Sequence, residues 1–430
     1  MKVISLIGFL TLLICFPVNS QISNITVHHY DINLIFDTKA EAISIILDCR
    51  IEMKDNLPEI KFLLNNECKI SSVKIRKDKK WNNIPYKFKG DSLIVNTRKN
   101  YHQDHNFDLK FEYSFPAGKF NDTVSAIDRG ERWYPLVMDQ IASFKLTCEV
   151  PVFCKVLAAG NLISSKIEGS TASYTWESQS PVFKLPLIIF NPAKYRNAEN
   201  DRVNFYYLSL DSIEVDKVIK KVSSVISYYS DIIAPYPYKK INLFEIKDFP
   251  GINTGSGLLM IGTQSLEMFG KGYEEGIILT VAQQWFGAGV FAEFGQKGFF
   301  FLSLSLPHYL RLMYIRHSEG KDKYLHKLNE MLDDYKKFAG QQVDIPIIDV
   351  DFPNTKEKGK ILYDKGPWVL SKIDSLITDS IWIKFIGNLY KSYQGKILTY
   401  NDFINFLSDY MKNKNDLNTI EKLLTEKGIK

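Results

Sequence analysis

Hydrophobic and polar residues alternate through the first half of the chain. The alternation is clear in four runs, at residues 30–36, 43–53, 107–113 and 144–150. Side chains of a β-strand point alternately to its two faces, so each run predicts a half-buried strand. Several such strands, separated by polar turns, predict an antiparallel sandwich or saddle of sheets between about residues 24 and 194.

The pattern changes after a polar, asparagine-rich stretch at residues 195–202, which we take as the domain boundary. Apolar residues between 213 and 229 recur at spacings of three and four, behind a capping pair of Asp211 and Glu214, and predict a long helix. Two short apolar runs, 243–246 and 258–261, predict strands on either side of a glycine-rich loop at 249–257. Helices are predicted at 274–286, 298–317, 321–338, 363–376, 379–393 and 399–411. The fold class is therefore α+β.

Composition and charge narrow the choice of function. The 430 residues include 45% hydrophobic and 24% charged positions, which excludes a disordered or collagen-like chain. The formal charge of +5 is spread along the chain without a basic cluster, so we expect no nucleic-acid partner.

The first twenty residues have the pattern of an export signal. Lys2 precedes an apolar run from Val3 to Phe16, and Pro17 to Ser20 are turn-forming or small. We predict a signal peptide at residues 1–20, cleaved after Ser20, and a periplasmic or extracellular location. A membrane anchor needs ~20 apolar residues, which this run lacks, and lipidation at Cys15 is disfavoured by the bulky Ile14 before it.

Four cysteines follow this signal, and an even number in an exported chain favours disulfides. The close pair of Cys148 and Cys154 flanks Pro151, as the two strands of a hairpin would, which leaves Cys49 with Cys68 as the simplest second pair. The sequence leaves all three connectivities open. A zinc knuckle is the competing interpretation, although the spacing lacks a Cys-x-x-Cys pair.

Several motifs, in order, resemble the membrane alanyl aminopeptidase family of zinc metallopeptidases, the gluzincins with a leukotriene-hydrolase-like fold. They are Trp133-Tyr134-Pro135, Ala158 to Leu162, Tyr236-Pro237-Tyr238 leading to Phe249-Pro250-Gly251, Gln284-Trp285-Phe286-Gly287 and Tyr363-Asp364-Lys365-Gly366. The resemblance implies an aminopeptidase-like β-saddle domain at residues 21–197. It also implies a degenerate thermolysin-like domain at 198–430, made of a small mixed sheet and a helical lobe.

The resemblance also locates the residues that a zinc peptidase needs, and here they are replaced. The two histidine ligands fall at Leu279 and Gln283, the general-base glutamate at Thr280 and the glutamate ligand at Leu302. Leucine has no lone pair, threonine is no base at neutral pH and a glutamine amide is a poor zinc ligand. We expect no metal or other cofactor, and we expect the two leucines to fill the site by apolar packing.

The substrate loop of the family falls at residues 251–255 of this chain, and it too has changed. The glutamate that would hold the substrate amine corresponds to Thr254, and its neighbours are Gly251, Ile252, Asn253 and Gly255. Tyr363 matches the tyrosine that stabilises the transition state, but without a metal-bound nucleophile we expect a structural role for it. On the helix after Leu302, we expect His308, Tyr309, Arg311 and Tyr314 to lie at a surface or groove.

The sequence therefore predicts an exported pseudopeptidase that binds a peptide or protein without hydrolysing it. The mature chain is expected to have no transmembrane segment. Two alternatives stay open: a peptidase with a relocated metal site, and a structural subunit of an envelope or surface assembly. The chain also ends soon after the helical lobe, so we expect a cleft that is open on that side.

Overall fold

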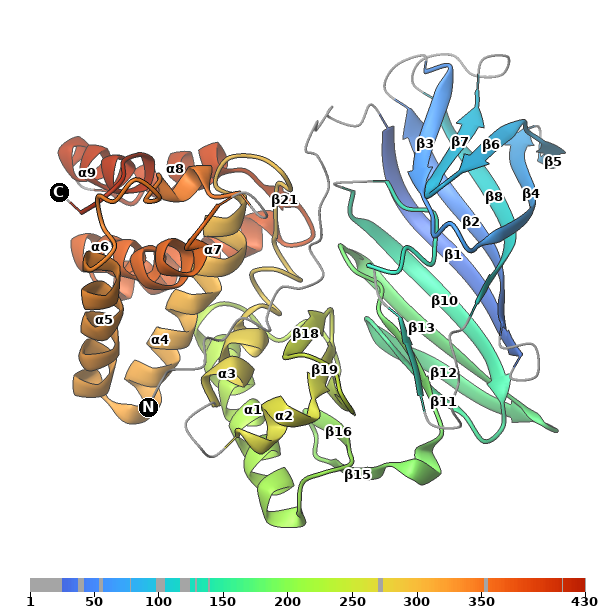
Figure 1. The fold of residues 1–430 in the computed structure, drawn as a ribbon, viewed down its shortest axis with the longest axis horizontal. Coiled ribbons are helices and arrows are strands. Elements are labelled where there is room, and N and C mark those ends of the chain that lie inside the picture. The colour runs from blue at the N-terminus through green and yellow to red at the C-terminus, as the bar shows by residue number, and fades with distance from the viewer. Residues whose placement is uncertain are drawn as a thin grey trace.

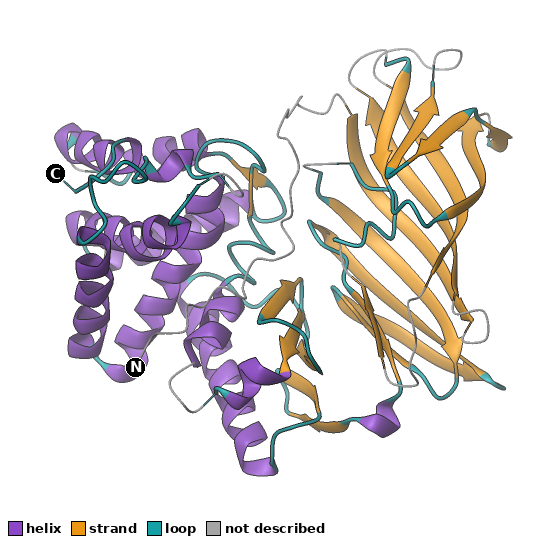
Figure 2. Ribbon diagram, in the orientation of Figure 1, coloured by secondary structure: helices purple, strands orange, loops and turns teal. Residues whose placement is uncertain are grey.

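The computed structural model describes residues 25–37, 42–53, 57–77, 79–97, 105–116, 124–127, 130–137, 140–269, 274–351, 355–411 and 413–429. The predicted signal peptide lies outside these ranges. Strands dominate one side of the molecule and helices the other, with a small sheet between them (Figures 1 and 2). The structure is thus the α+β arrangement that the two hydrophobic periods predict. In the part of the chain that the structure describes, no helix is long and apolar enough to cross a membrane.

The amino-terminal half is built on an eight-stranded sheet with the order β12-β13-β10-β1-β2-β8-β4-β5. Its long strands alternate between buried and exposed residues, as predicted. Neighbouring strands are antiparallel except for β1 and β10, which run parallel. The strands are β1 (Ile25–Asp37), β2 (Ala42–Met53), β4 (Lys69–Lys77), β5 (Lys80–Asn83), β8 (His105–Pro116), β10 (Ala142–Pro151), β12 (Asn161–Glu168) and β13 (Thr171–Val182).

Two three-stranded sheets share a core with the inner face of the large sheet. Phe62 of one small sheet, for example, packs edge-on against Phe111 of β8, with ring centroids 5.3 Å apart. The first has the order β3-β7-β6, with β3 at Glu59–Leu63, β6 at Tyr86–Lys89 and β7 at Ser92–Asn96. The second has the order β11-β14-β9, with β9 at Val124–Ile127, β11 at Lys155–Ala158 and β14 at Leu187–Phe190.

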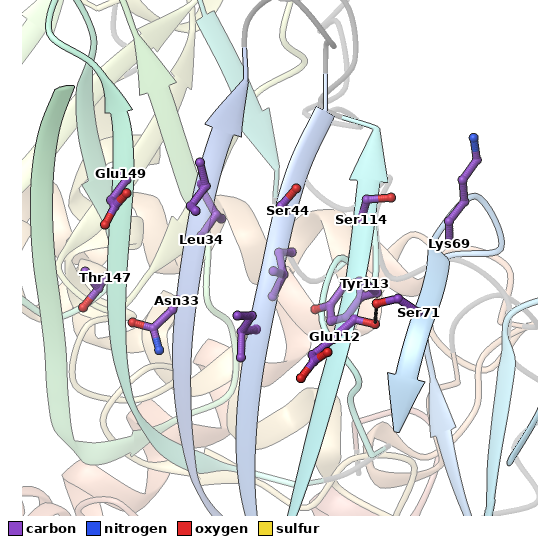
Figure 3. A pocket seen from close by; sticks show the side chains of 13 residues that line it. Asn33, Leu34, Ser44, Lys69, Ser71, Glu112, Tyr113, Ser114, Thr147 and Glu149 are labelled. Atoms are coloured by element: carbon purple, nitrogen blue, oxygen red, sulfur yellow. Dashed lines mark hydrogen bonds between the residues drawn. The ribbon is translucent and has the colours of Figure 1, made fainter. Parts of the chain in front are cut away.

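The opposite face of the large sheet is open and mostly polar. A trough of about 420 Å³ crosses β1, β2, β8 and β10, and Asn33, Thr147 and Glu149 are among the side chains that point into it (Figure 3). Ile35 and Ile46 also lie on this face, 53% and 46% exposed. From Tyr30 onward, period-two alternation sends the even-numbered residues of β1 into the core, and the odd-numbered Asn33 and Ile35 line this trough.

The predicted disulfides are absent, because the strand order separates the cysteines. Cys49 pairs with Leu109 of β8, whereas Cys68 directly precedes Lys69, which pairs with Ser114 of the same strand. Five residues along β8 span about 17 Å. A disulfide needs a Cα–Cα separation of roughly 4.4–6.8 Å. Both thiols are free and buried, and burial raises the pKa of each, to about 12 for Cys68.

Cys148 and Cys154 are also free and buried. The predicted hairpin between them is wrong, because β10 pairs with β1 and β13. The sheet neighbours of Cys148 in β10 are Leu34 of β1 and Tyr174 of β13. Cys154 follows a turn that leads away to β11, in a different sheet. Burial raises the pKa of both thiols, that of Cys154 to about 11, so neither is a reactive thiolate.

A five-stranded mixed sheet with the order β15-β16-β17-β19-β18 forms the base of the second half. The three inner strands are parallel and both edge strands are antiparallel to their neighbours. The strands are β15 (Arg196–Glu199), β16 (Val203–Tyr207), β17 (Ile241–Ile246), β18 (Ile252–Gly255) and β19 (Leu258–Gly262). The polar stretch at 195–202 therefore contains a strand, and so does the glycine-rich loop.

Helix α1 (Ser212–Ile232) packs its buried stripe into the core of this half. Its predicted capping box is present, since Glu214 N–H donates to Asp211 Oδ1 at 2.8 Å and Asp211 N–H donates to Glu214 Oε2 at 3.0 Å. The stripe recurs at spacings of three and four, as the sequence predicts.

Helices α2 and α3 lie beside the five-stranded sheet and α1, and helices α4 to α9 form the lobe at the carboxy-terminal end of the chain (Figure 1). They are α2 (Thr263–Glu267), α3 (Glu274–Ala282), α4 (Leu306–Glu319), α5 (Lys321–Lys336), α6 (Gly366–Ile377), α7 (Asp379–Tyr393), α8 (Tyr400–Ser408) and α9 (Lys414–Thr425). Two short parallel strands, β20 (Phe291–Ala292) and β21 (Ile397–Leu398), pair within it. Short 3₁₀ turns occur at η2 (Pro192–Lys194) and η4 (Ile347–Asp349).

Two π-helical turns precede α4 and α6, where the sequence predicts ordinary helix. They are η3 (Phe301–Ser305) and η5 (Lys360–Lys365). Ser305 Oγ donates to Leu362 O at 2.7 Å, and a Cβ at Gly366 would lie 2.2 Å from Ser305 Oγ. The close crossing of the two turns therefore requires glycine at position 366, and it places Leu302 and Tyr363 on adjoining segments.

Candidate functional site

Helix α3 supplies two of the positions that the sequence assigns to the site, and a third follows directly after it. Leu279 and Thr280 are buried, 3% and 0% exposed. The Thr280 hydroxyl donates to the carbonyls of Gly276 and Ile277, each at 3.0 Å. It therefore bonds the helix that carries it, as threonine hydroxyls in helices commonly do, and its proton does not point toward a ligand.

Gln283, just after α3, is nearly buried, and its Oε1 has no hydrogen-bond partner among the described residues. The next residue, Gln284, is fully buried and fully bonded. Its Nε2 donates to Thr254 Oγ1 at 2.8 Å and to Gly255 O at 2.9 Å, and its Oε1 accepts from Gly257 N–H at 2.8 Å. Gln284 thus connects the end of α3 to β18 and to the turn after it.

The substrate-loop residues form the edge strand β18 and its approach. Gly251 precedes the strand and accepts a hydrogen bond from Gly262 N–H at 2.8 Å. Ile252 and Gly255 are buried, whereas Asn253 and Thr254 are half-buried. A Cβ at position 255 would lie 2.5 Å from Pro186 Cγ, so glycine is required there for the strand to pass the amino-terminal domain.

Leu302 and Tyr363 lie on the two π-helical turns. Leu302 is 4% exposed and belongs to the apolar core of the second half, whereas Leu279 lies outside that apolar cluster. The structure therefore buries both leucines without showing the predicted contact between them. Tyr363 is half-buried, and burial raises the pKa of its hydroxyl to about 12, so it stays protonated at neutral pH.

Tyr363 stacks on His308 of α4, with ring centroids 4.5 Å apart and planes inclined by 20°. His308 is 5% exposed, and burial, together with the nearby Arg311, holds its pKa well below the ordinary value. Its Nδ1 and the Nε of Arg311 have no hydrogen-bond partner among the residues described. The neutral imidazole and the tyrosine form one packed unit beside the site.

The expected surface position of His308, Tyr309, Arg311 and Tyr314 is wrong, because all four are buried in α4. Tyr309 donates to Asp374 Oδ2 at 2.5 Å and Tyr314 donates to Ser224 Oγ at 3.0 Å. Arg311 Nη1 lies 2.6 Å from Glu275 Oε2. The two tyrosine hydroxyls and Arg311 Nη1 thus have partners inside the second half of the molecule, which offsets the cost of burying them.

Glu275, one helical turn before Leu279, has a role that the sequence does not predict. Burial alone would raise the pKa of its carboxyl, but Arg311 and Lys327 outweigh burial and lower it. Glu275 is therefore an ionised anchor for two cations. The local sequence does not indicate this role of Glu275, because its two partners, Arg311 and Lys327, come from α4 and α5.

The motif that carries Tyr363 also contains a carboxyl with a perturbed pKa. Burial raises the pKa of Asp364 to about 6, even though Lys360 Nζ lies 3.4 Å from Asp364 Oδ2 and opposes the shift. A carboxyl whose folded pKa exceeds its unfolded value destabilises the fold when both states are ionised. That cost is lost as the pH falls through about 6 toward 4.

We therefore expect Asp364→Asn to stabilise the protein by about 1–3 kcal/mol near neutral pH, and to have little effect at about pH 4. Urea denaturation at both pH values measures the difference. Asp409→Asn, at the exposed end of α8, is the matched control and should change the free energy of unfolding by less than about 0.5 kcal/mol at either pH. Equal effects of Asp364→Asn at the two pH values would contradict the raised pKa.

Comparison with known proteins gives no match to a family model and none to a curated protein. Solved structures do match. The M1 zinc metallopeptidase from Deinococcus radiodurans superimposes with a TM-score of 0.71 over 94% of each chain, at 15% identity. A mutant of that enzyme bound to a Tyr-Ser-Ala substrate gives a TM-score of 0.73 at 14% identity, over 95% of this chain and 96% of the other. Native yeast leukotriene A4 hydrolase gives 0.75 at 15% identity, over 95% of this chain and 69% of its own.

The chain has the aminopeptidase-like fold of these structures. Within that fold, the residues at the positions assigned to the zinc ligands do not suit zinc. Leu279 and Leu302 offer no lone pair, and Gln283 offers one amide oxygen. Elsewhere in the described ranges, no three His, Cys, Asp or Glu side chains group as metal ligands.

Proposed function

We propose that the protein is an exported pseudopeptidase, an aminopeptidase-like fold that binds a peptide or protein without hydrolysing it. The observation that carries the proposal is the state of Thr280, which occupies the position of the general base. Its hydroxyl is fully buried and donates into its own helix, so it neither activates water nor meets a ligand. Peptide hydrolysis needs an activated nucleophile, and neither Thr280 nor the residues at the assigned ligand positions supplies one.

We place the peptide along β18, which is the terminal strand in the order of its sheet. An extended peptide can add to such an edge through main-chain hydrogen bonds, which need no metal and no particular side chain. Gln284 supports this, because its bonds to Thr254, Gly255 and Gly257 hold the edge strand against α3.

The same strand carries no carboxylate where an aminopeptidase needs one for the substrate amine. Thr254 occupies that position, and its hydroxyl accepts a hydrogen bond from Gln284. A peptide bound along β18 should therefore gain nothing from a free amino terminus. Together with the signal-like residues 1–20, this favours a binder in the periplasm or outside the cell that recognises internal or capped segments.

The test incubates the full mature chain, dialysed against zinc, with a mixture of random short peptides in free and N-acetylated form. We expect retained peptides to be recovered at full length, and acetylation to change their Kd by less than about twofold. Hydrogen exchange should slow at residues 252–255 when the peptides are bound.

Each other outcome is informative. Peptides shortened by one residue, with zinc bound to the protein, would establish a peptidase with a relocated metal. Retention of no peptide, together with elution as a stable complex of several chains, would favour the structural subunit. A strong preference for the free amine would contradict the loss of the amine anchor.

A further inference from the structure

A second groove lies between the two halves of the molecule, away from the site described above. It encloses about 690 Å³ between β12 and β13 of the large sheet and β15, β16 and β17 of the small sheet. These strands approach one another in the lower part of Figure 1. Its lining residues contribute to neither α3 nor the π-helical turns.

The walls of the groove are fixed in position. Gly160 N–H donates to Ser256 O at 2.8 Å and Lys239 N–H donates to Asn161 Oδ1 at 2.9 Å, so each half of the molecule bonds the other. Beside these bonds, Phe190 packs edge-on against Tyr206 and Phe244, each with ring centroids 4.8 Å apart. A groove held in this way is preorganised for a ligand.

The floor of the groove is formed by apolar residues on the core-facing side of the large sheet, and those of β12 are exposed to solvent. Trp176 of β13 pairs with Leu146 on one side and with Leu162 of β12 on the other, on the face that is buried elsewhere in the sheet. Trp176 is 3% exposed, but Leu162 is 39% exposed and Ile167, farther along β12, is 67% exposed. Exposed apolar residues on a sheet face rimmed by charge are typical of an interaction site.

Positive charge dominates the rim. Four lysines and one carboxylate, Glu199, line the groove. Two of these lysines are ion-paired, Lys240 with Glu199, at 2.7 Å between Nζ and Oε2, and Lys166 with Glu168. Lys155 contacts Tyr206, with its Nζ 3.5 Å from the hydroxyl and 5.7 Å from the ring centroid. Lys239 has no ion-pair partner in the described part of the chain. The groove therefore presents ammonium groups that lack a counter-charge.

A buried donor also lacks an acceptor. The indole Nε1–H of Trp176 has no hydrogen-bond partner among the described residues, although the side chain is almost completely buried. Lysine can only donate hydrogen bonds, so the ammonium groups at the rim are matched by acceptors on the ligand. Carboxylates and main-chain carbonyls are such acceptors.

The shape of β12 indicates an extended ligand. β12 is the terminal strand of the eight-stranded sheet, and nearly all its residues are exposed on both faces. An exposed edge strand with apolar side chains is a template for another strand, and soluble proteins usually protect such edges. Lys166 lies on this strand, and a lysine on an edge strand discourages non-specific pairing with other strands.

We propose that this groove docks an extended acidic segment of a partner protein, which pairs along β12 with alternate side chains directed into the groove. Its apolar side chains lie over Leu162, Ile167 and Trp176, and its carboxylates lie near Lys155, Lys239 and Lys240. The apolar floor and the strand edge favour a peptide over a nucleic acid, which would need a longer basic track. This proposal does not depend on the pseudopeptidase proposal, since it uses other residues.

The test uses the full mature chain and a fluorescent peptide of alternating glutamate and valine, with a lysine and valine peptide for comparison. We expect the acidic peptide to bind, the basic one not to bind, and the double variant Lys239→Glu with Lys240→Glu to weaken binding by about tenfold or more. The matched control, Lys87→Glu with Lys89→Glu on the exposed edge of β6, makes the same charge change far from the groove and should alter Kd by less than about twofold.

Hydrogen exchange distinguishes the two sites. Slower exchange at residues 161–168 on peptide binding supports docking at β12, whereas slower exchange confined to 252–255 would overturn it. Equal weakening by both double variants would show a general charge effect and would also overturn it. So would binding of a single-stranded oligonucleotide that depends on Lys239 and Lys240 without binding of the acidic peptide.

Discussion

The combined substitutions Leu279→His, Thr280→Glu, Gln283→His and Leu302→Glu are expected to give a chain that binds about one zinc ion after dialysis. Positions 279 and 283 are one helical turn apart at the end of α3, the spacing at which two imidazoles can share one metal. Position 302 lies on η3, which packs near α3 through α4. Metal content, measured by mass spectrometry on protein of known concentration, tests this.

The native chain and a partial variant are the controls. The native chain should hold less than about one tenth of a zinc ion per chain under the same dialysis, since none of the four positions carries a strong ligand. A variant with the first three substitutions but leucine kept at 302 should bind zinc at least tenfold more weakly, because the third protein ligand is missing.

Activity is expected to stay low even in the zinc-bound variant. Thr254 leaves no carboxylate for the substrate amine, so hydrolysis of aminoacyl substrates should remain far below that of an aminopeptidase. A folded variant, judged by an unchanged circular dichroism spectrum, that takes up no zinc would contradict the positions assigned to the ligands. If the fourfold variant does not fold, zinc binding is measured on the partial variant instead, because that variant adds less buried charge.

The strands and the long helices could be predicted from sequence because their apolar positions repeat locally. In β1 and β2 every second residue is buried, and in α1 the buried residues follow the helical period and begin at a capping box. The local pattern does not predict the short strands β15 and β18, since their polar and glycine residues are stabilised by pairing with β16 and β19. It does not predict helix α9 either, because that helix depends on packing against α6 and η4.

The pairing of the cysteines and the burial of the polar α4 side chains could not be predicted from the local sequence pattern. Cys49 and Cys68 are close in sequence, but β8 separates β2 from β4 and sets their register. His308 and Arg311 are polar residues in a helix, which suggests a solvent-facing side, and their burial depends on Tyr363 and Glu275 from other elements. Such positions are decided by tertiary contacts, and only the motif resemblance could place Tyr363 near α4 beforehand.

The two adjacent glutamines, Gln283 and Gln284, should respond very differently to the same substitution. Gln284→Leu is expected to destabilise the protein by about 3–5 kcal/mol. It leaves Gly257 N–H and Gly255 O without this partner in a buried place, where each unsatisfied group costs about 1–3 kcal/mol, and it also removes the bond to the half-buried Thr254 hydroxyl. Leucine has a similar volume, so the loss is one of hydrogen bonds and little cavity is created.

Gln283→Leu is the matched control, because its Oε1 is already unpaired in the folded state. Removing a buried acceptor that has no partner should change the free energy of unfolding by less than about 1 kcal/mol, or raise it slightly. Urea denaturation measures both variants, and hydrogen exchange at residues 252–257 should be faster in the Gln284 variant alone. If the two variants lost equal stability, Gln284 would not be what connects α3 to the edge strand, and the proposed peptide-binding edge would lose its main support.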